Sequence, residues 1–420
     1  MILSTRYPVK VFTKFVRYCY LFYLYHTLKE YIIIKGHGSI SALGHDKQTV
    51  SSSYNSARPD FQSPDATPIG SLQKKGSELL EQLSLEKRAY KGLDRSVLLA
   101  MYASRQAVVQ AGWGNEKDIS INIGSSRGAT TLFEEYISEF QRTGKVPPNT
   151  SPLTTLGNIS SWVAQDLNTS GPGISHSVTC STGLQAIANG FAWLKSGMAN
   201  KFLAGAAEAP LTPFTIAQMK AIGIYSDESM MPYPCRPLNA LKKNTFVLGE
   251  GAAVFALEKV SEKQLNADKT SPVIISSIGF GFENISSKTG ISKEGNNFQL
   301  AILDAIENAG QQLPVDMIIM HAPGTVAGDS AELNAIRNVF ANTGLPIISS
   351  SKWMTGHTLG ASGCLAIEYA MHILETQTYL DFPYPIVVEP VRKEKPIRRI
   401  LVVAAGFGGN AAAVILDKGR

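Results

Sequence analysis

The chain contains an internal repeat, and this repeat limits its possible folds more than any other feature. "GEGAAVFALEK" at 249–259 matches "GGNAAAVILDK" at 408–418, and "CSTGLQAIANG" at 180–190 matches "GASGCLAIEYA" at 360–370. Two similar halves are the simplest account. The alternative is a chance likeness between segments rich in Gly and Ala. The two pairs have different offsets, so the first half is expected to carry extra chain within residues 208–245.

Apolar runs typical of buried strands alternate with helical patterns. The predicted strands are "YIIIKGHG" (31–38), "DISINIG" (118–124), "ISHSVTC" (174–180), "KFLAGAA" (201–207), "AAVFALEK" (252–259), "DMIIMHA" (316–322), "PIISSSK" (346–352) and "RILVVAAGFGG" (399–409). Between them lie helical segments such as 96–112, and apolar residues at 3–4 spacing follow both Cys180 and His357. This alternation predicts an α/β fold.

Composition narrows the class of protein further. The chain has 420 residues, 44% apolar and 17% charged, which is typical of an ordered globular protein. Its four cysteines, Cys19, Cys180, Cys235 and Cys364, are far apart and lack the spacing of metal ligands. We therefore expect reduced thiols in a cytoplasmic protein, with no structural metal.

The first 31 residues differ from the rest of the chain. They carry Arg6, Lys10, Lys14, Arg17 and Lys29 against a single acid, Glu30, and so supply most of the formal net charge of +5. The body is nearly neutral and gives no support for a nucleic-acid groove. The uncharged run from 18 to 25 is too short to span a bilayer. Packing on this protein or a partner, contact with a membrane surface, and a mis-assigned start remain open for this extension.

Cys180 is the first candidate for chemistry. It stands where an apolar run gives way to a helical pattern with small residues behind it. A thiol at a helix N-terminus has a lowered pKa and is a good nucleophile. A free cysteine is also commonly a small buried apolar residue, and this local stretch alone does not separate the two interpretations.

Other candidates follow predicted strands of the second half. His321 opens "HAPGT" and His357 precedes "TLGASG", so each is expected at the carboxyl end of a strand, where open α/β sheets assemble their sites. Lys352 lies five residues before His357 and is placed to tune a neighbouring base. Glu332 begins a predicted helix, where capping is the simpler role. "GFGG" at 406–409 either exposes Phe407 on a tight loop or simply turns the chain after a strand.

Several enzyme classes lack their motifs here. The sequence contains no P-loop, HExxH or GxSxG, and "GHGSISALG" lacks the glycine spacing of a dinucleotide fingerprint.

Taken together, the motifs resemble the elongating β-ketoacyl-ACP synthases of the thiolase superfamily. The likeness spans residues 32 to 417 and rests on "VTCSTGLQAIANG", "AGAAEAPLTPFTIAQM", "FVLGEGAAVFALE", "HAPGTVAGDSAEL", "SKWMTGHTLGASG" and "GFGGNAAAVIL". "GSSRGATTLFEEY" and "TSPLTTLGNISSWVAQDL" are most similar to synthases of aryl-polyene and flexirubin-type pigment clusters. The resemblance implies a five-layered αβαβα thiolase fold built from two halves, 32–262 and 263–420, after the extension 1–31.

The resemblance also implies roles for single residues. Cys180 would carry an acyl chain as a thioester, and His321 and His357 would assist decarboxylation of malonyl-ACP. Lys352 would organise the histidines, with Glu332 as a buried acid. Phe407 would gate the tunnel, supported by Gly408 and Gly409, and its backbone N–H would join that of Cys180 in an oxyanion hole. Thr325 would bind phosphopantetheine.

The sequence departs from the family pattern in two of these motifs. "HAPGT" replaces HGTGT, so Pro323 stands in place of a threonine and Thr325 alone keeps the pantetheine role. "GFGGNA" replaces GFGGTN, which changes the hydrogen bonding expected around the gate at Asn410 and Ala411. A thiolase would carry a second cysteine in this last loop, whereas Cys364 lies on a predicted helix.

The implied partners are an acyl carrier protein and a second subunit, identical or a related ketosynthase, with no metal or other cofactor. Carrier proteins are acidic, so a basic rim is expected, with Lys242, Lys243 and "RKEKPIRR" (392–399) as candidates. A non-catalytic chain-length partner of the same fold is the alternative. Retention of Cys180, His321 and His357 favours the enzyme.

Overall fold

A computed structural model describes residues 29–154, 156, 158–285, 287, 290–310, 313–389, 391 and 395–419. Residues 1–28 of the basic extension, with Cys19, lie outside the described residues, as do residues 392–394 of the proposed basic rim. Within the described ranges, no helix has the length and apolar character to cross a membrane.

Ten strands form one mixed sheet in the order β3-β2-β4-β5-β1-β6-β10-β9-β7-β8. The strands are β1 Glu30–Ser41, β2 Ser120–Gly124, β3 Gly173–Ile174, β4 Lys201–Glu208, β5 Gly251–Ser261, β6 Val273–Phe282, β7 Met317–Ile319, β8 Ile347–Ser349, β9 Arg399–Gly406 and β10 Asn410–Lys418. β1 and β6 pair only at 32–34 and 273–275, so the sheet divides into two blocks that share one short seam.

The helices are α2 Lys47–Ser56, α3 Lys74–Glu86, α4 Arg95–Ala111, α5 Thr130–Thr143, α6 Thr150–Thr154, α7 Asn158–Leu167, α8 Thr182–Ser196, α9 Pro213–Ala221, α10 Glu262–Ala267, α11 Asn296–Ala309, α12 Val326–Val339, α13 Lys352–Thr355 and α14 Ser362–Thr376. Short 3₁₀ turns are η1 Pro64–Ala66, η2 Arg88–Tyr90, η3 Glu228–Met230 and η4 Leu359–Ala361.

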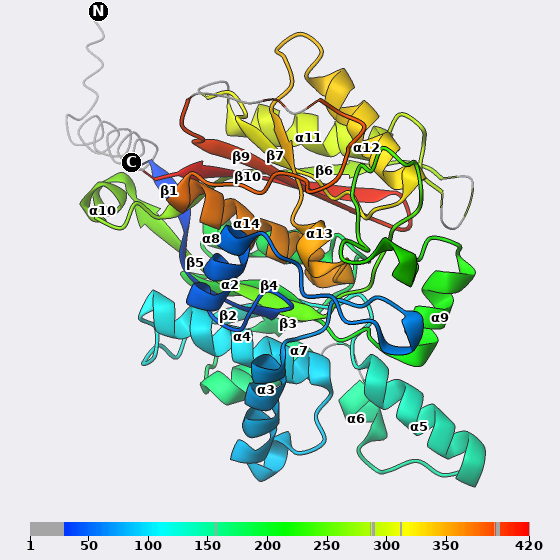
Figure 1. The fold of residues 1–420 in the computed structure, drawn as a ribbon. Helices are drawn as coiled ribbons and strands as arrows, with labels where there is room; N and C mark the ends of the chain where they lie inside the picture. The colour runs from blue at the N-terminus through cyan, green and yellow to red at the C-terminus, as the bar shows by residue number, and fades with distance from the viewer. Residues whose placement is uncertain are drawn as a thin grey trace, which may run out of the picture.

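The elements stack in five layers (Figure 1). α8 and α14 lie side by side between the two sheet blocks, and their apolar faces, including Leu184, Ile187 and Ile367, share one buried cluster with Phe255 of β5 and Val402 of β9. α3, α4 and α7 cover the outer face of the first block, and α11 and α12 cover that of the second. The five-layered αβαβα arrangement predicted above is therefore confirmed.

The internal repeat is visible in the topology. Reading inward from each edge, β3-β2-β4-β5-β1 corresponds to β8-β7-β9-β10-β6, and α8 corresponds to α14. The extra chain of the first half lies where the repeat places it, because residues 209–250 separate β4 from β5 while only residues 407–409 separate β9 from β10. The second half has its own longer connection at residues 377–398.

Local signals explain the bounds of the outer helix α4 and the end of the central helix α8. α4 begins after Asp94, whose side chain accepts from the N–H of Ser96, and ends at Gly112 in the left-handed conformation. α8 likewise ends at Gly197 with positive φ. The predicted strand 174–180 is wrong, because only Gly173 and Ile174 pair with β2 and the chain then turns toward Cys180. β6 was not predicted.

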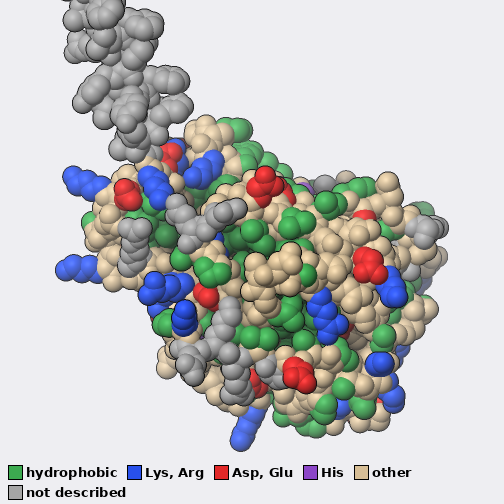
Figure 2. Space-filling model, turned by 90° about the horizontal axis from the view of Figure 1, so that it is seen from above, with side chains coloured by type: hydrophobic (Ala, Val, Ile, Leu, Met, Phe, Trp, Pro, Cys, Tyr) green, Lys and Arg blue, Asp and Glu red, His purple; other side chains and the backbone are tan. Residues whose placement is uncertain are grey.

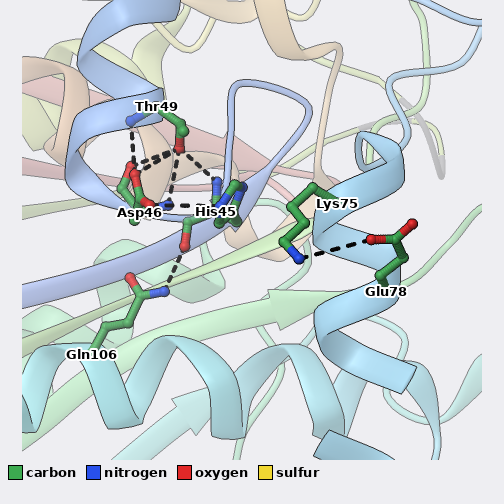
Figure 3. Close-up of polar contacts among 6 residues, drawn as sticks. All are labelled: His45, Asp46, Thr49, Lys75, Glu78 and Gln106. Atoms are coloured by element: carbon green, nitrogen blue, oxygen red, sulfur yellow. Dashed lines mark hydrogen bonds and ion pairs between the residues drawn. The ribbon is translucent and has the colours of Figure 1, made fainter. Parts of the chain in front are cut away.

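The loop that leads into α2 is fixed against α4. Asp46 and Thr49 form a capping box at its N-terminus, and Gln106 of α4 donates to the carbonyl of His45 at 2.6 Å (Figure 3). At the end of α14, Lys47 of α2 pairs with Glu375 at 2.8 Å. The first and second halves thus meet at this outer end as well as at the core.

Candidate active site

One cavity of about 320 Å³ brings together residues that are far apart in the sequence. Its lining includes Cys180 from the first half and His321, Thr325, His357 and Phe407 from the second. The imidazole rings of His321 and His357 lie edge to face, with centroids 5.0 Å apart and planes at 80°. The cavity therefore combines a thiol with two imidazoles.

Cys180 lies in a tight turn before α8. Thr179 has φ of 50°, an uncommon conformation for a β-branched residue, and Cys180 bridges back to Val178. Ser181 ties this turn to its surroundings, since its hydroxyl donates to the carbonyl of Val178 at 2.9 Å and to the side chain of Asn410. The strained turn presents the thiol at the cavity instead of continuing the chain directly into the helix.

The expected lowering of the Cys180 pKa is wrong. The pKa of this thiol is raised to about 12, because burial and then the negative charge of Glu208 raise it by more than Lys352 lowers it. The sulfur packs with an apolar cluster that includes Met219, Phe246 and Leu359, and α8 begins only two residues later. Desolvation of the thiolate therefore outweighs the helix dipole.

His357 is held in one tautomer. Its Nδ1 accepts a hydrogen bond of 2.9 Å from the N–H of Leu359, so the proton of the neutral ring is on Nε2. Burial and the nearby Lys352 hold the pKa of His357 well below its usual range. The ring is therefore a neutral N–H donor at physiological pH. It does not end a strand as predicted, because α13 separates it from β8.

His321 follows β7, and Glu332 fixes its backbone. The two carboxylate oxygens of Glu332 accept from the N–H groups of His321 and Ala322, each at 2.7 Å. Glu332 is fully buried, so it is a buried acid as predicted. The expectation that it begins and caps a helix is wrong, because α12 begins at Val326 with Thr325 as its cap and Glu332 lies inside it. Burial, Lys352 and His357 lower the pKa of the His321 ring, so this imidazole is also neutral.

Lys352 is a buried cation beside this pair, at 4% exposure on α13. Burial lowers its pKa and the charge of Glu332 raises it. Because its charge influences the pKa of Cys180 and of both histidines, Lys352 acts on all three groups of the cavity.

Phe407 stands at the cavity on the tight turn between β9 and β10, with 41% of its surface exposed. Gly408 and Gly409 have φ of 98° and 82°, a region that other residues rarely adopt, and a Cβ on Gly409 would also collide with the carbonyl of Glu283. Asn410, the departure from the family pattern, donates to the carbonyl of Phe407 at 3.1 Å. Asn410 therefore connects the gate turn to Ser181 beside the thiol.

The backbone of the gate turn lies against that of the thiol turn. Thr179 donates to the carbonyl of Phe407 at 3.2 Å, and a Cβ on Gly406 would lie 2.8 Å from the nitrogen of Cys180 and overlap Thr179. This close approach brings the backbone of residues 406–407 against that of residues 179–180, the two turns that contain the expected oxyanion donors.

Thr325 caps α12 by accepting from the N–H of Gly328 at 3.3 Å, and Pro323 lines the cavity beside it. A hydroxyl that accepts one hydrogen bond can still donate another, so the cap leaves Thr325 able to bind a ligand. In the described part of the chain, no cluster of three or more His, Cys, Asp or Glu side chains has the geometry of a metal site.

Sequence reasoning missed the residues that hold the two histidine loops. The extra chain of the first half ends in a segment that binds them: the N–H of His357 donates to the carbonyl of Val247 at 2.7 Å, and the N–H of Thr245 donates to that of Gly324 at 2.7 Å. Asp329 accepts from the N–H groups of Gly324 and Thr325. Among these residues, only Asp329 of "GDSAEL" acts through a charged side chain, so it was the one available signal in the sequence.

The proposed basic rim is only partly available. Lys242 and Lys243 are exposed next to Asn244, which lines the cavity. Arg399, in contrast, is 5% exposed and pairs with Asp417 at 2.7 Å, so it is structural. This corrects the interpretation of "RKEKPIRR" as a continuous surface patch.

Comparisons with known proteins identify the family. Residues 31–263 match the β-ketoacyl synthase N-terminal domain, and residues 273–382 match the β-ketoacyl synthase C-terminal domain. The 3-oxoacyl-[acyl-carrier-protein] synthase 2 of Staphylococcus aureus (strain COL) is 27% identical over 412 residues, which cover 92% of this chain and 98% of that protein.

Two solved structures share the fold. A type II polyketide ketosynthase in complex with its acyl carrier protein superimposes with a TM-score of 0.80 at 19% identity, covering 93% of this chain and 100% of that one. The ketosynthase and chain length factor complex from Xenorhabdus doucetiae gives 0.72 at 19% identity, with 93% and 98% covered. Since the two domain matches together span most of the described residues, the chain belongs to the β-ketoacyl synthase family and is an acyltransferase-type enzyme.

Proposed function

We propose that this protein is a catalytic β-ketoacyl-[acyl carrier protein] synthase that extends an acyl chain by decarboxylative condensation with malonyl-ACP. The observation that carries the proposal is the single cavity shared by the Cys180 thiol and the two neutral imidazoles of His321 and His357. A thiol supplies a covalent acceptor, and neutral imidazoles supply N–H donors for an enolate.

The first step loads the enzyme. The sulfur of Cys180 attacks the carbonyl carbon of an acyl-ACP thioester and the bond from that carbon to the carrier's sulfur breaks. The proton of the Cys180 thiol passes to the leaving sulfur, so the carrier's phosphopantetheine leaves as a thiol. The developing oxyanion is bound by the adjoining peptide N–H groups of Cys180 and Phe407. The apolar cluster around the sulfur suits an aliphatic chain, since it includes Met219 and Phe246.

The second step forms the carbon–carbon bond. Malonyl-ACP loses carbon dioxide, and the electron pair of the broken bond forms a thioester enolate whose oxygen accepts from the imidazole N–H groups. The enolate carbon attacks the acyl carbonyl on Cys180, whose thiolate then leaves, so the product is a β-ketoacyl-ACP two carbons longer. His357 suits this role because its proton is fixed on Nε2.

An acyl carrier protein is the proposed partner, together with a second ketosynthase-type subunit, identical or related. Carrier recognition is assigned to Lys242 and Lys243, which are exposed near the cavity mouth. On the described surface seen in Figure 2, Lys and Arg side chains are dispersed among apolar and neutral ones.

The alternative is a non-catalytic chain-length partner, and acylation separates the two functions. The purified protein and its Cys180→Ala variant are each incubated with a panel of acyl-ACPs, and their intact masses are measured by mass spectrometry. A catalytic ketosynthase gains the mass of the acyl group only when Cys180 is present, and then releases β-ketoacyl-ACP on addition of malonyl-ACP. Absence of both adduct and product across the panel would assign the partner function.

The similarity to pigment-cluster synthases, based on segments 124–136 and 150–167, leads us to propose a polyene chain as the product. The mass of the carrier-bound product tests this directly. Acceptance of unsaturated acyl starters in preference to saturated ones of equal length is the expected result, and equal turnover of both would contradict it.

A further inference from the structure

Glu208 is a buried acid next to the cavity for which the reaction above has no use. It is the last residue of β4 and is fully buried. Its Oε1 accepts from the backbone N–H of Ser126, after β2, and from that of Gly360, in η4, at 3.1 Å. Its Oε2 has no hydrogen-bond partner among the described residues. The carboxyl group therefore joins the first half to the turn that follows His357.

The turn held by Glu208 is the one that fixes the tautomer of His357. Leu359 donates its N–H to Nδ1 of His357, and the next N–H along the chain, from Gly360, goes to Glu208. Leu359 has φ of 43°, a conformation that a leucine adopts only when its surroundings enforce it. A Cβ on Gly360 would lie 2.6 Å from Oε1 of Glu208, so the contact is also sterically close.

We propose that Glu208 is a positioning residue that holds the 358–361 turn, and through it keeps the ring of His357 in the Nε2-protonated orientation required for enolate stabilisation. Without the carboxyl acceptor, the strained Leu359 relaxes, and its N–H no longer meets Nδ1. The ring is then free to populate the other tautomer. This inference rests on the proposed condensation, yet its structural part does not depend on activity.

The test compares wild-type enzyme with Glu208→Ala, Glu208→Asp and Glu208→Gln. Imidazole nitrogen resonances of ¹⁵N-histidine-labelled protein report the tautomer, with His357 assigned from His357→Asn. Wild type should show Nε2 protonated and Nδ1 bare. Glu208→Ala should show mixed tautomers and about a 100-fold slower decarboxylation of malonyl-ACP, since a small misplacement of a catalytic group can cost that much. Glu208→Gln, which keeps the acceptor, should restore both.

Alkylation of Cys180 by iodoacetamide distinguishes a specific loss of His357 orientation from a general disruption of the active site. Glu208 disfavours the thiolate, so its removal should leave alkylation no slower while decarboxylation falls. Glu368→Ala is the matched control, because Glu368 is also a buried acid, on α14, but it accepts from the hydroxyl of Ser39 instead of the His357 turn. It should leave the His357 resonances unchanged.

A wild-type tautomer in Glu208→Ala, or equal losses of decarboxylation and alkylation, would overturn the proposal. If the alanine variant does not fold, Glu208→Asp decides, because its shorter side chain withdraws the acceptor and should give an intermediate tautomer ratio. An enzyme without condensing activity would refute the proposed function, while the nitrogen resonances would still decide the role of Glu208.

Discussion

The two central helices begin in equivalent places, and the two places are used differently. Cys180 stands two residues before α8, and Gly360 stands two residues before α14. The strand end facing Cys180 is Gly406, which has no side chain, whereas the strand end facing Gly360 is Glu208, whose carboxylate accepts the Gly360 N–H. One site is left open for a substrate oxygen, and the other is closed by a side chain.

This difference shows how a repeated fold yields a single active site. Both halves supply peptide N–H groups at a helix start, which is a general anion-binding arrangement. In the proposed reaction, only the open copy has a nucleophile, Cys180, and the closed copy is adjacent to the ring of His357, which would need a fixed orientation. The repeat therefore provides reactivity in one half and rigidity in the other.

A side chain added at Gly406, the strand end that faces Cys180, should have the largest effect on activity. Gly406→Ala places a Cβ against Thr179 and 2.8 Å from the nitrogen of Cys180, so the thiol turn and the oxyanion donors must shift. We expect acyl transfer to Cys180 to fall by about 100-fold to 1000-fold, the cost of losing one oxyanion donor. Single-turnover acylation followed by intact mass measures it.

Gly360→Ala is the matched change in the closed copy. Its Cβ collides with Glu208 and lies 2.9 Å from the nitrogen of Ser126, so it should destabilise the fold by about 1–3 kcal/mol, as overpacking does. Cys180 should still be acylated at a rate near wild type. Equal loss of acylation in both variants would contradict the division between the copies.

The pH dependence of Cys180 alkylation tests whether the helix start in the open copy lowers the pKa of the thiol. Because the pKa of Cys180 is raised to about 12, the thiolate is a minor species at neutral pH and its fraction increases tenfold per pH unit. Alkylation should therefore rise about 100-fold from pH 7 to 9 without a plateau. A plateau below pH 8 would mean that the helix start lowers the pKa after all.

Lys352→Met should lower that alkylation rate by a few fold at each pH, because the charge of Lys352 lowers the thiol pKa. The exposed Lys243 provides the control, since Lys243→Met should leave the profile unchanged. Faster alkylation in Lys352→Met would show that its charge does not favour the thiolate.

An effect of similar size is expected at the gate. Asn410→Ala removes the bonds to Ser181 and to the carbonyl of Phe407, so the turn should loosen and condensation should slow by about 3-fold to 10-fold, or roughly 1 kcal/mol for a hydrogen bond. Asn308→Ala removes two bonds from an exposed asparagine of α11 and should have no effect on turnover. Equal condensation rates for the two variants would show that Asn410 does not support the gate turn.

Much of the fold could be predicted because the repeat and the apolar alternation are properties of short segments. The helix pattern at 96–112 became α4, and the matched segments became β5, β10, α8 and α14. The failed strand at 174–180 shows the limit, because its apolar residues serve a turn that is determined by tertiary contacts. β6 was missed because two glycines and two serines interrupt its apolar pattern.

The site could be predicted in its members but not in its supports. Cys180, His321 and His357 stand in recognisable motifs, whereas the acceptors that hold them, such as Glu208 and Val247, act across the two halves through backbone groups. Such partners leave no local pattern. Burial of the thiol, which reverses the expected pKa shift, also depends on side chains brought together only by folding.

The bonds from residues 245–249 to the histidine loops have a consequence for biosynthesis. These backbone groups leave the ribosome with the first half and remain without their partners until residues 324 and 357 have been made. A nascent first half can pack α8 and its outer helices, but it cannot complete the chamber around its sulfur. Two fragments divided between β5 and β6 should therefore regain function only when they are expressed together.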